Sequence, residues 1–138
     1  MAEFNWSKVN YVLGVSVMDD THEEFIDLYN KLMHADDAHF AVLFEEFYLH
    51  TKAHFEEENR LMEQSCFPAL SEHKGEHQRV INELNYFRSK VAENKYSFPR
   101  FYIKDRIPLW FRLHLATMDS ALAAHLNNTA TADIEQSA

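Results

Sequence analysis

The chain has 138 residues, the length of a single domain that can fold without disulfides. Its net charge of −9 argues against binding to nucleic acid, and no apolar stretch is long enough to cross a bilayer. The single cysteine, Cys66, cannot form an intrachain disulfide, and the first residues do not resemble a signal peptide. We therefore expect a protein of the reducing cytoplasm.

Turn-forming residues are scarce. Only two glycines and three prolines occur, which predicts a few long helices. Residues 1–17 look like an N-terminal arm, whose apolar side chains, including Trp6 and Tyr11, can pack over one end of a bundle. A first helix is expected over residues 18–33, where apolar side chains recur on one face.

Candidate capping residues mark where the first two helices begin. Asp19 or Thr21 is expected to cap the first helix. Asp36 or Asp37 is expected to cap the second, which runs to about Gln64 with a 3.6-residue apolar period.

Two further helices follow the break at Pro68. The third is expected from about residue 70 to residue 93, and the stretch "NKYSFPRFYIKD" then reads as a linker. A fourth helix is expected to start near residues 105–108, where a proline in the first turn removes no needed hydrogen bond, and to end near Asn127. Residues 128–138 are expected to form a flexible tail.

The expected fold is all-α. Four amphipathic helices joined mostly by short loops predict an antiparallel up-and-down four-helix bundle over residues 18–127, preceded by the arm. No internal repeat or second domain is apparent, so we expect one domain over residues 1–138.

Histidines and carboxylates recur on the inward faces of the expected helices. His54 and Glu58, like His73 and His77, are four residues apart and can converge on a common point. The other candidates are His22 on the first helix and His114 and Asp119 on the fourth. Seven ligands are too many for one tetrahedral zinc, and they suit two metal ions joined by bridging carboxylates. The mixture of nitrogen and oxygen favours iron, with copper, zinc and manganese as alternatives.

The remaining polar residues favour simpler interpretations. His34, His39, His50 and His125 are expected outside the site, and Cys66 is expected to be an inert small residue in a turn. No histidine has a glutamate three residues before it, as ferritin-like di-iron motifs require. "HEEF" lacks the second histidine of a zinc-protease motif.

These motifs together resemble hemerythrin in its bacterial single-domain form. The resemblance rests on "MDDTHEEF", "HFEEENRLM", "FPALSEHKGEH" and "WFRLHLATMD", one for each helix, and covers nearly the whole chain. It implies a non-heme di-iron protein that reversibly binds dioxygen as a hydroperoxide, for storage, buffering or delivery. By this resemblance one iron is held by His73, His77 and His114, and the other by His22 and His54. Glu58 and Asp119, with an oxo or hydroxo group, would bridge the two irons.

The resemblance also implies an apolar oxygen pocket near the open position of the two-histidine iron. Its expected walls are Phe25, Phe55, Trp110, Phe111 and Leu115.

Departures from the family pattern occur beside the ligands. Thr21 stands where many relatives have glutamine, and Cys66 and Phe67 stand where a glycine and an aromatic residue are common. Leu122 stands where relatives often carry tyrosine, which removes a possible hydroxyl donor near Asp119.

Two other classes of function use the same site. One is a di-iron redox enzyme that reduces peroxide or nitric oxide or oxidises iron, and that needs an electron donor. The other is an oxygen or redox sensor, although residues 128–138 are too few for an output module. We favour an oxygen-binding protein over an enzyme, with dioxygen as ligand and an electron donor or an oxygen-consuming enzyme as possible partner. The sequence does not fix the oligomeric state.

Overall fold

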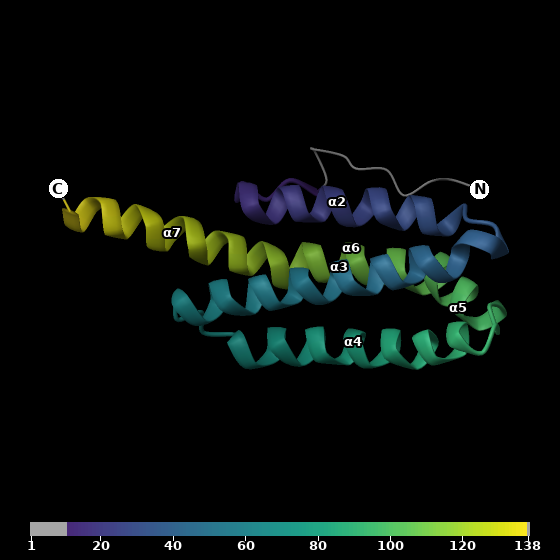
Figure 1. Cartoon of the computed structure of the whole chain (residues 1–138). Helices are drawn as coiled ribbons and strands as arrows, with labels where there is room; N and C mark the ends of the chain where they lie inside the picture. The colour runs from purple at the N-terminus through teal and green to yellow at the C-terminus, as the bar shows by residue number, and fades with distance from the viewer. Residues whose placement is uncertain (1–10, 138) are drawn as a thin grey trace.

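The computed structural model describes the backbone of residues 11–137 and the side chains of residues 11–129 (Figure 1). Trp6 of the expected arm lies outside the described residues. All regular structure within residues 11–137 is helical, which confirms the all-α prediction. The elements in chain order are α2 (Ser16–Met33), α3 (Asp37–Gln64), α4 (Leu70–Ala92), α5 (Ser97–Phe101), the π-helical turn η1 (Tyr102–Arg106), α6 (Ile107–His114), the π-helical turn η2 (Leu115–Asp119) and α7 (Ser120–Ser137).

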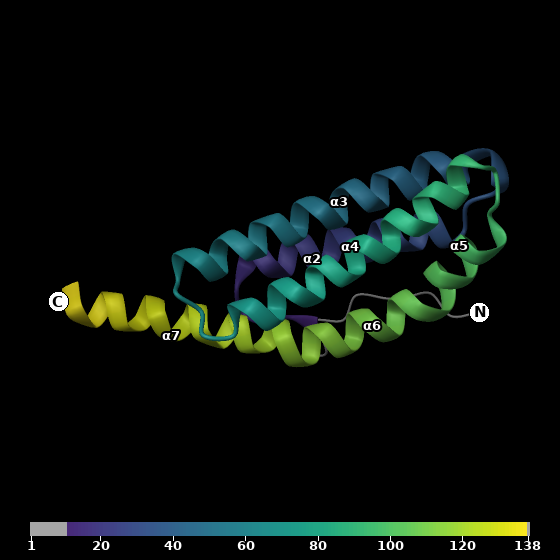
Figure 2. The ribbon, with the colours of Figure 1, turned by 90° about the horizontal axis from the view of Figure 1, so that it is seen from below.

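These elements form the expected antiparallel four-helix bundle. Helices α2, α3 and α4 alternate in direction, and α5 to α7 follow one another as the fourth rod (Figures 1 and 2). No helix in the described part of the chain is long and apolar enough to cross a membrane. The four rods are not of equal length, because α7 projects beyond the other helices at the C-terminal end (Figure 1).

The start of the first helix differs from the prediction. Helix α2 begins at Ser16, and neither expected residue caps it. The Asp19 carboxylate instead accepts hydrogen bonds from the backbone N–H groups of Leu13 (2.7 Å) and Gly14 (3.1 Å), which holds the preceding segment against the helix. The Thr21 hydroxyl donates to the Val17 carbonyl within the helix. The capping pattern in the sequence therefore predicted the region where the helix begins, but not the contacts that Asp19 and Thr21 make there.

The second and third helices agree more closely with the prediction. Asp36 is the N-cap of α3, and its side chain accepts a hydrogen bond from the His39 N–H, as expected of a capping aspartate. Helix α3 ends at Gln64 as predicted, and α4 ends at Ala92, one residue before the predicted end.

Helix α6 begins at Ile107 with Pro108 in its first turn, as predicted, but the fourth rod as a whole begins earlier. The stretch read as a linker folds into α5 and η1, so the helix starts at Ser97, with Pro99 in its first turn. Pro108 therefore lies inside the rod, where its ring would clash with the carbonyl four residues earlier in a regular α-helix. The π turn η1 directly precedes it and widens the backbone there. At the other end, α7 continues to Ser137 through the segment expected to be a tail.

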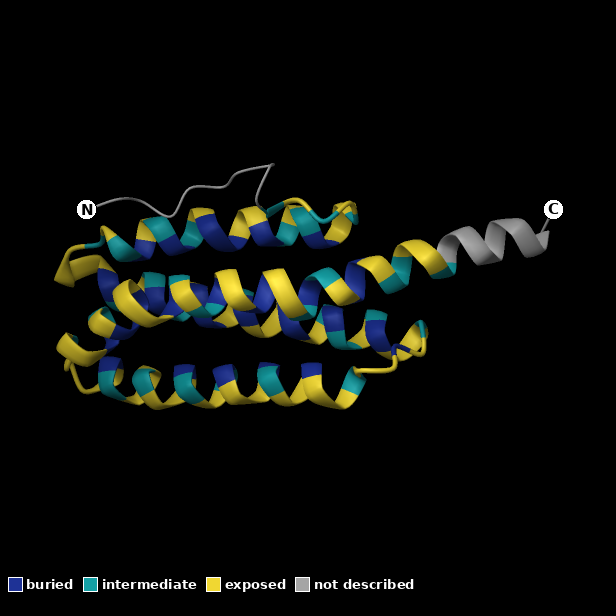
Figure 3. Cartoon of the chain, turned by 180° about the vertical axis from the view of Figure 1, so that it is seen from behind, coloured by how far each residue is buried: buried dark blue, intermediate teal, exposed yellow. Residues whose placement is uncertain are grey.

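Two apolar clusters fill the bundle, and the buried residues face its interior (Figure 3). The larger cluster lies toward the α2–α3 loop and includes Phe25, Phe55, Phe111 and Leu115. The smaller cluster contains Met18, Met62, Phe67, Leu122 and Ala123. The described part of the expected arm packs against this core through Tyr11, Leu13 and Val15.

Two helices end in the same hydrogen-bonded turn. After α3, the Cys66 N–H donates to the Glu63 carbonyl and the Phe67 N–H donates to the Met62 carbonyl. After α4, Asn94 occupies the position equivalent to that of Cys66. Both residues have left-handed backbone angles, with φ of 54° at Cys66 and 61° at Asn94. Asparagine tolerates this conformation, whereas cysteine is strained in it.

We predict that Cys66→Gly stabilises the protein by about 0.5–1 kcal/mol, because glycine adopts a positive φ without a Cβ clash. Chemical denaturation of the metal-free protein measures the change. Asn94→Gly is the matched control and should give a smaller gain. A loss of stability in Cys66→Gly would mean that the Cys66 side chain makes a contact worth more than the strain.

Candidate metal centre

Seven polar side chains meet in the middle of the bundle, and every one is buried. They come from all four rods: His22 from α2, His54 and Glu58 from α3, His73 and His77 from α4, His114 from α6 and Asp119 from η2. These are the seven residues that the sequence pattern selected. One donor atom from each of Glu58, His73, His77, His114 and Asp119 lies within 4.8 Å of the others, and His22, His54 and Glu58 form a second such group.

The first group faces one oxygen of each carboxylate. The Nε2 atoms of His73 and His114 lie 3.1 and 3.2 Å from Asp119 Oδ1. His77 Nε2 lies 3.2 Å from Glu58 Oε1. Three imidazoles and two carboxylate oxygens therefore converge on this side.

The second group faces the other oxygens of the same carboxylates. His22 Nε2 lies 3.1 Å from Asp119 Oδ2, and His54 Nε2 lies 2.6 Å from Glu58 Oε2. Glu58 and Asp119 thus each present one oxygen to the three-histidine side and one to the two-histidine side. This is the arrangement that two carboxylates need to bridge two metal ions.

The π turn η2 explains how His114 and Asp119 share one side. Residues five apart on a regular α-helix point about 140° away from each other. The π turn spans Leu115–Asp119, and its hydrogen bonds join residues five apart, which returns Asp119 to the face of His114. The Ser120 hydroxyl donates to the Leu115 carbonyl (2.8 Å) beside this turn.

Burial and the neighbouring charged groups shift the pKa values of the site residues in opposite directions. Burial lowers the pKa of His22 and of His73, but the neighbouring carboxylates of Asp119 and Glu58 outweigh it and raise each pKa to about 9. Burial raises the pKa of both carboxyl groups, yet the surrounding histidines hold each well below its usual value. For His77 burial dominates and lowers the pKa, so this imidazole is neutral at pH 7.

Metal ions would satisfy the donor atoms of the site better than hydrogen bonds among the side chains do. Both ring nitrogens of His22, His73 and His114, Nε2 of His77 and one oxygen of each carboxylate have no hydrogen-bond partner among the described residues, despite the short distances between them. Buried polar atoms without partners are costly. Metal ions placed between the inward nitrogens and the carboxylate oxygens would satisfy them, and the mixture of imidazole and carboxylate suits iron.

Aromatic rings surround the ligand candidates. Trp110 stacks on His114 with ring centroids 4.8 Å apart, and Phe55 stacks on His77 at 4.0 Å. Phe111 lies edge-on to His22 at 5.7 Å.

The other expected pocket residues lie in the same region. Phe25 stacks on Phe111 at 4.8 Å, and Leu115 is buried in the same cluster. Leu122 borders the site from the opposite side: it is fully buried three residues after Asp119, in the smaller cluster beside Met18 and Phe67. The site is therefore enclosed by apolar groups on two sides.

The histidines expected outside the site have other surroundings. His50 Nε2 lies 3.3 Å from a Glu24 carboxylate oxygen, and His125 Nε2 lies 2.7 Å from the Ser65 carbonyl. His39 contacts the Asp36 carboxylate at the start of α3. His34 ends α2 and belongs to neither of the two donor groups.

Two contacts of the site residues were not predicted. The Asn59 Oδ1 atom lies 2.9 Å from His77 Nδ1, and a hydrogen bond there leaves Nε2 as the donor atom that faces Glu58. The Trp110 indole N–H donates to Glu76 Oε1 (2.9 Å), which fixes the ring against His114. Both contacts join residues on different helices.

Comparison with known proteins decides the family. The hemerythrin HHE cation-binding domain matches residues 13–128 of this chain. The chain belongs to the hemerythrin family. A bacteriohemerythrin of Ralstonia nicotianae is 32% identical over 126 residues, which cover 91% of this chain and 90% of that protein. One of Aquifex aeolicus is 31% identical and covers 84% of this chain and 92% of its own length.

Solved structures show the same fold. A wild-type hemerythrin has a TM-score of 0.79 at 18% identity, with 91% of this chain and 98% of that chain covered. A leucine-to-alanine mutant of hemerythrin has a TM-score of 0.80 at 19% identity with the same coverage. The family's cation-binding domain and the buried cluster of histidines and carboxylates together support metal binding by this chain.

We predict that metal binding displaces protons from His22 and His73, which are protonated near pH 7 in the metal-free protein. Loading with Fe²⁺ under argon should release about two protons per chain at pH 7, and the affinity should rise with pH. Titration calorimetry in two buffers of different ionisation enthalpy measures the release. His50→Ala is the control that should change nothing, whereas His54→Ala should lose metal.

The stability of the metal-free protein should fall as pH rises, whereas its metal affinity should rise. A raised histidine pKa stabilises the folded state fully below the unfolded value of 6.5, and this stabilisation is lost as pH rises to about 9. Thermal unfolding at these two pH values tests the sign. Equal melting temperatures would contradict a protonated, buried histidine pair.

We predict that Asn59→Leu accelerates iron loss roughly ten-fold or more, because the His77 ring loses the acceptor that orients it. Release of iron to a chelator measures the rate, and circular dichroism checks the fold. Asn59→Asp keeps an acceptor and should retain iron like the wild type. Wild-type retention in Asn59→Leu would exclude this role.

Proposed function

We propose that this protein holds two iron ions and binds dioxygen reversibly, to store, buffer or deliver it in the cytoplasm. His73, His77 and His114 would hold one iron, His22 and His54 the other, and Glu58 and Asp119 would bridge them. The iron pair, when bound, supplies the two electrons that dioxygen accepts and returns.

The observation that carries the proposal is the unequal division of donors around two shared carboxylates. Three imidazoles face one side and two face the other, while each carboxylate faces both. The two-histidine side thus has one protein ligand fewer. A position for a small ligand is expected there, beside His22 and His54.

The side chains around that position favour reversible binding over catalysis. Phe111 lies against His22, and Phe55 lies 5.6 Å from His54, so apolar rings border the two-histidine side. A dry border limits the entry of the water and protons that drive irreversible oxidation. A redox enzyme would need polar access for substrate and protons at the same place.

We expect the purified protein to contain two irons per chain and to show an absorption band that appears in air and disappears under argon over repeated cycles. This cycling is the test of the proposed function. A band that decays directly to the oxidised form in each cycle would support an enzyme or a sensor instead.

We predict that Leu122→Tyr shortens the lifetime of the oxygenated form. Leu122 is fully buried three residues after Asp119, so a tyrosine hydroxyl there would bring a polar group and water toward the carboxylate. The decay of the absorption band in air measures the lifetime, after iron content is checked. Leu122→Met, which conserves volume, is the control. A longer lifetime in Leu122→Tyr at full iron content would contradict the expectation that a polar group near the carboxylate speeds decay.

A further inference from the structure

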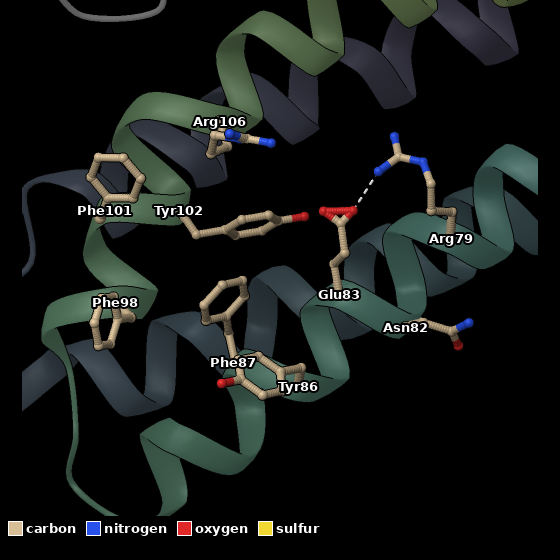
Figure 4. Close-up of a pocket in the computed structure, with 9 residues that line it drawn as sticks. All are labelled: Arg79, Asn82, Glu83, Tyr86, Phe87, Phe98, Phe101, Tyr102 and Arg106. Carbon is tan, nitrogen blue, oxygen red and sulfur yellow. Dashed lines mark hydrogen bonds and ion pairs between the residues drawn. The ribbon is translucent and has the colours of Figure 1, made fainter.

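A hollow lies away from the metal centre, between α4 and the segment formed by α5 and η1 (Figure 4). We call it the α4–α5 hollow. Its volume is about 600 Å³, within the range of sites for small molecules. Five aromatic residues line it: Tyr86, Phe87, Phe98, Phe101 and Tyr102.

The rings provide flat apolar surfaces from two directions. Phe87 from α4 and Tyr102 from η1 are stacked, with centroids 4.5 Å apart and planes 29° apart. Phe98 and Phe101 lie at the opposite end of the hollow from Glu83 (Figure 4). Phe98 is 73% exposed and Phe101 56%, which is unusual for phenylalanine. Such surfaces suit a flat ring system that stacks against them.

The charge at the hollow favours an anion. Arg79 is engaged by Glu76 and Glu83, but Arg106 has no ion-pair partner among the described side chains. Arg106 lies beside the Tyr102 ring at the edge of the hollow (Figure 4). An unpaired guanidinium is well suited to bind phosphate or carboxylate.

The sequence around the hollow also contains more basic than acidic residues. Residues 79–112 contain eight lysines and arginines and three acidic residues, whereas the whole chain contains 13 and 22. Among the residues that line the hollow, Arg79 and Arg106 are basic and Glu83 is acidic, so the lining carries a net positive charge in an acidic protein. Symmetric pairing of two copies through this face would bring the two unpaired Arg106 guanidinium groups toward each other, which disfavours a second copy as the occupant.

We propose that the α4–α5 hollow binds a small, flat aromatic molecule that carries a phosphate or a carboxylate. The ring system lies among Phe98, Phe101 and Tyr102, and the anionic group pairs with Arg106. This site is separate from the oxygen site and does not depend on the proposed function.

Flavin mononucleotide and riboflavin are suitable probes, because they share a ring system and differ by a phosphate. Titration calorimetry on the purified full chain should show one flavin mononucleotide per chain, bound more tightly than riboflavin. Arg106→Gln should weaken flavin mononucleotide binding about tenfold or more and leave riboflavin unchanged. Phe98→Ser, at an exposed position, should weaken both. Lys104→Gln is the matched control, since it removes the same charge from the same turn outside the hollow, and it should change neither.

Three results would overturn the proposal. The first is the absence of saturable binding of flavin mononucleotide. The second is equal weakening in Arg106→Gln and Lys104→Gln, which would reduce the effect to overall charge. The third is a dimer in sedimentation velocity that Phe98→Ser dissociates, because the hollow would then be an interface between copies. Circular dichroism of each variant confirms that the fold is retained.

Discussion

Two carboxylates, Glu58 and Asp119, are buried in the centre of the bundle, and their negative charge constrains everything around them. An isolated carboxylate in an apolar interior is very unfavourable, so it must be neutralised by cations or protons. Five imidazoles from all four rods provide this environment in the metal-free protein, and metal ions provide it when they are bound. Each helix must therefore be in register with the others, because a shift of one residue would turn its donors away from the carboxylates.

Apolar packing makes this arrangement specific. The larger cluster covers the site toward the α2–α3 loop, and the smaller cluster covers it toward the α3–α4 loop. Stacked rings such as Trp110 on His114 leave few rotamers for the ligand candidates. The polar centre is thus held by rigid neighbours, and the hydrogen bond of His77 to Asn59 and that of Trp110 to Glu76 extend this order outward. Orientation and dryness are the two properties that reversible oxygen binding would require.

The sequence predicted the parts of this structure that depend on regular helical spacing. His54 with Glu58, and His73 with His77, follow from a four-residue step on a helix. The five-residue step from His114 to Asp119 does not, because it needs a π turn that no local pattern announces.

The helical stretch before α6 was missed for a related reason. Pro99 and Pro108 both fit a first turn, and only the packed bundle distinguishes them. Asn59 was missed because its partner His77 lies on another helix, and contacts between helices depend on the distance at which they pack. Sequence spacing thus identifies donors within a helix, whereas the groups that orient those donors appear only in three dimensions.

Anomalous diffraction at the iron edge, from crystals of the iron-loaded protein, tests most directly whether Glu58 and Asp119 bridge two metal ions. We expect two iron peaks, one beside His73, His77 and His114 and one beside His22 and His54, with an oxygen of each carboxylate bound to each iron. A single peak, or two irons that do not share both carboxylates, would contradict the bridging role on which the proposed function depends.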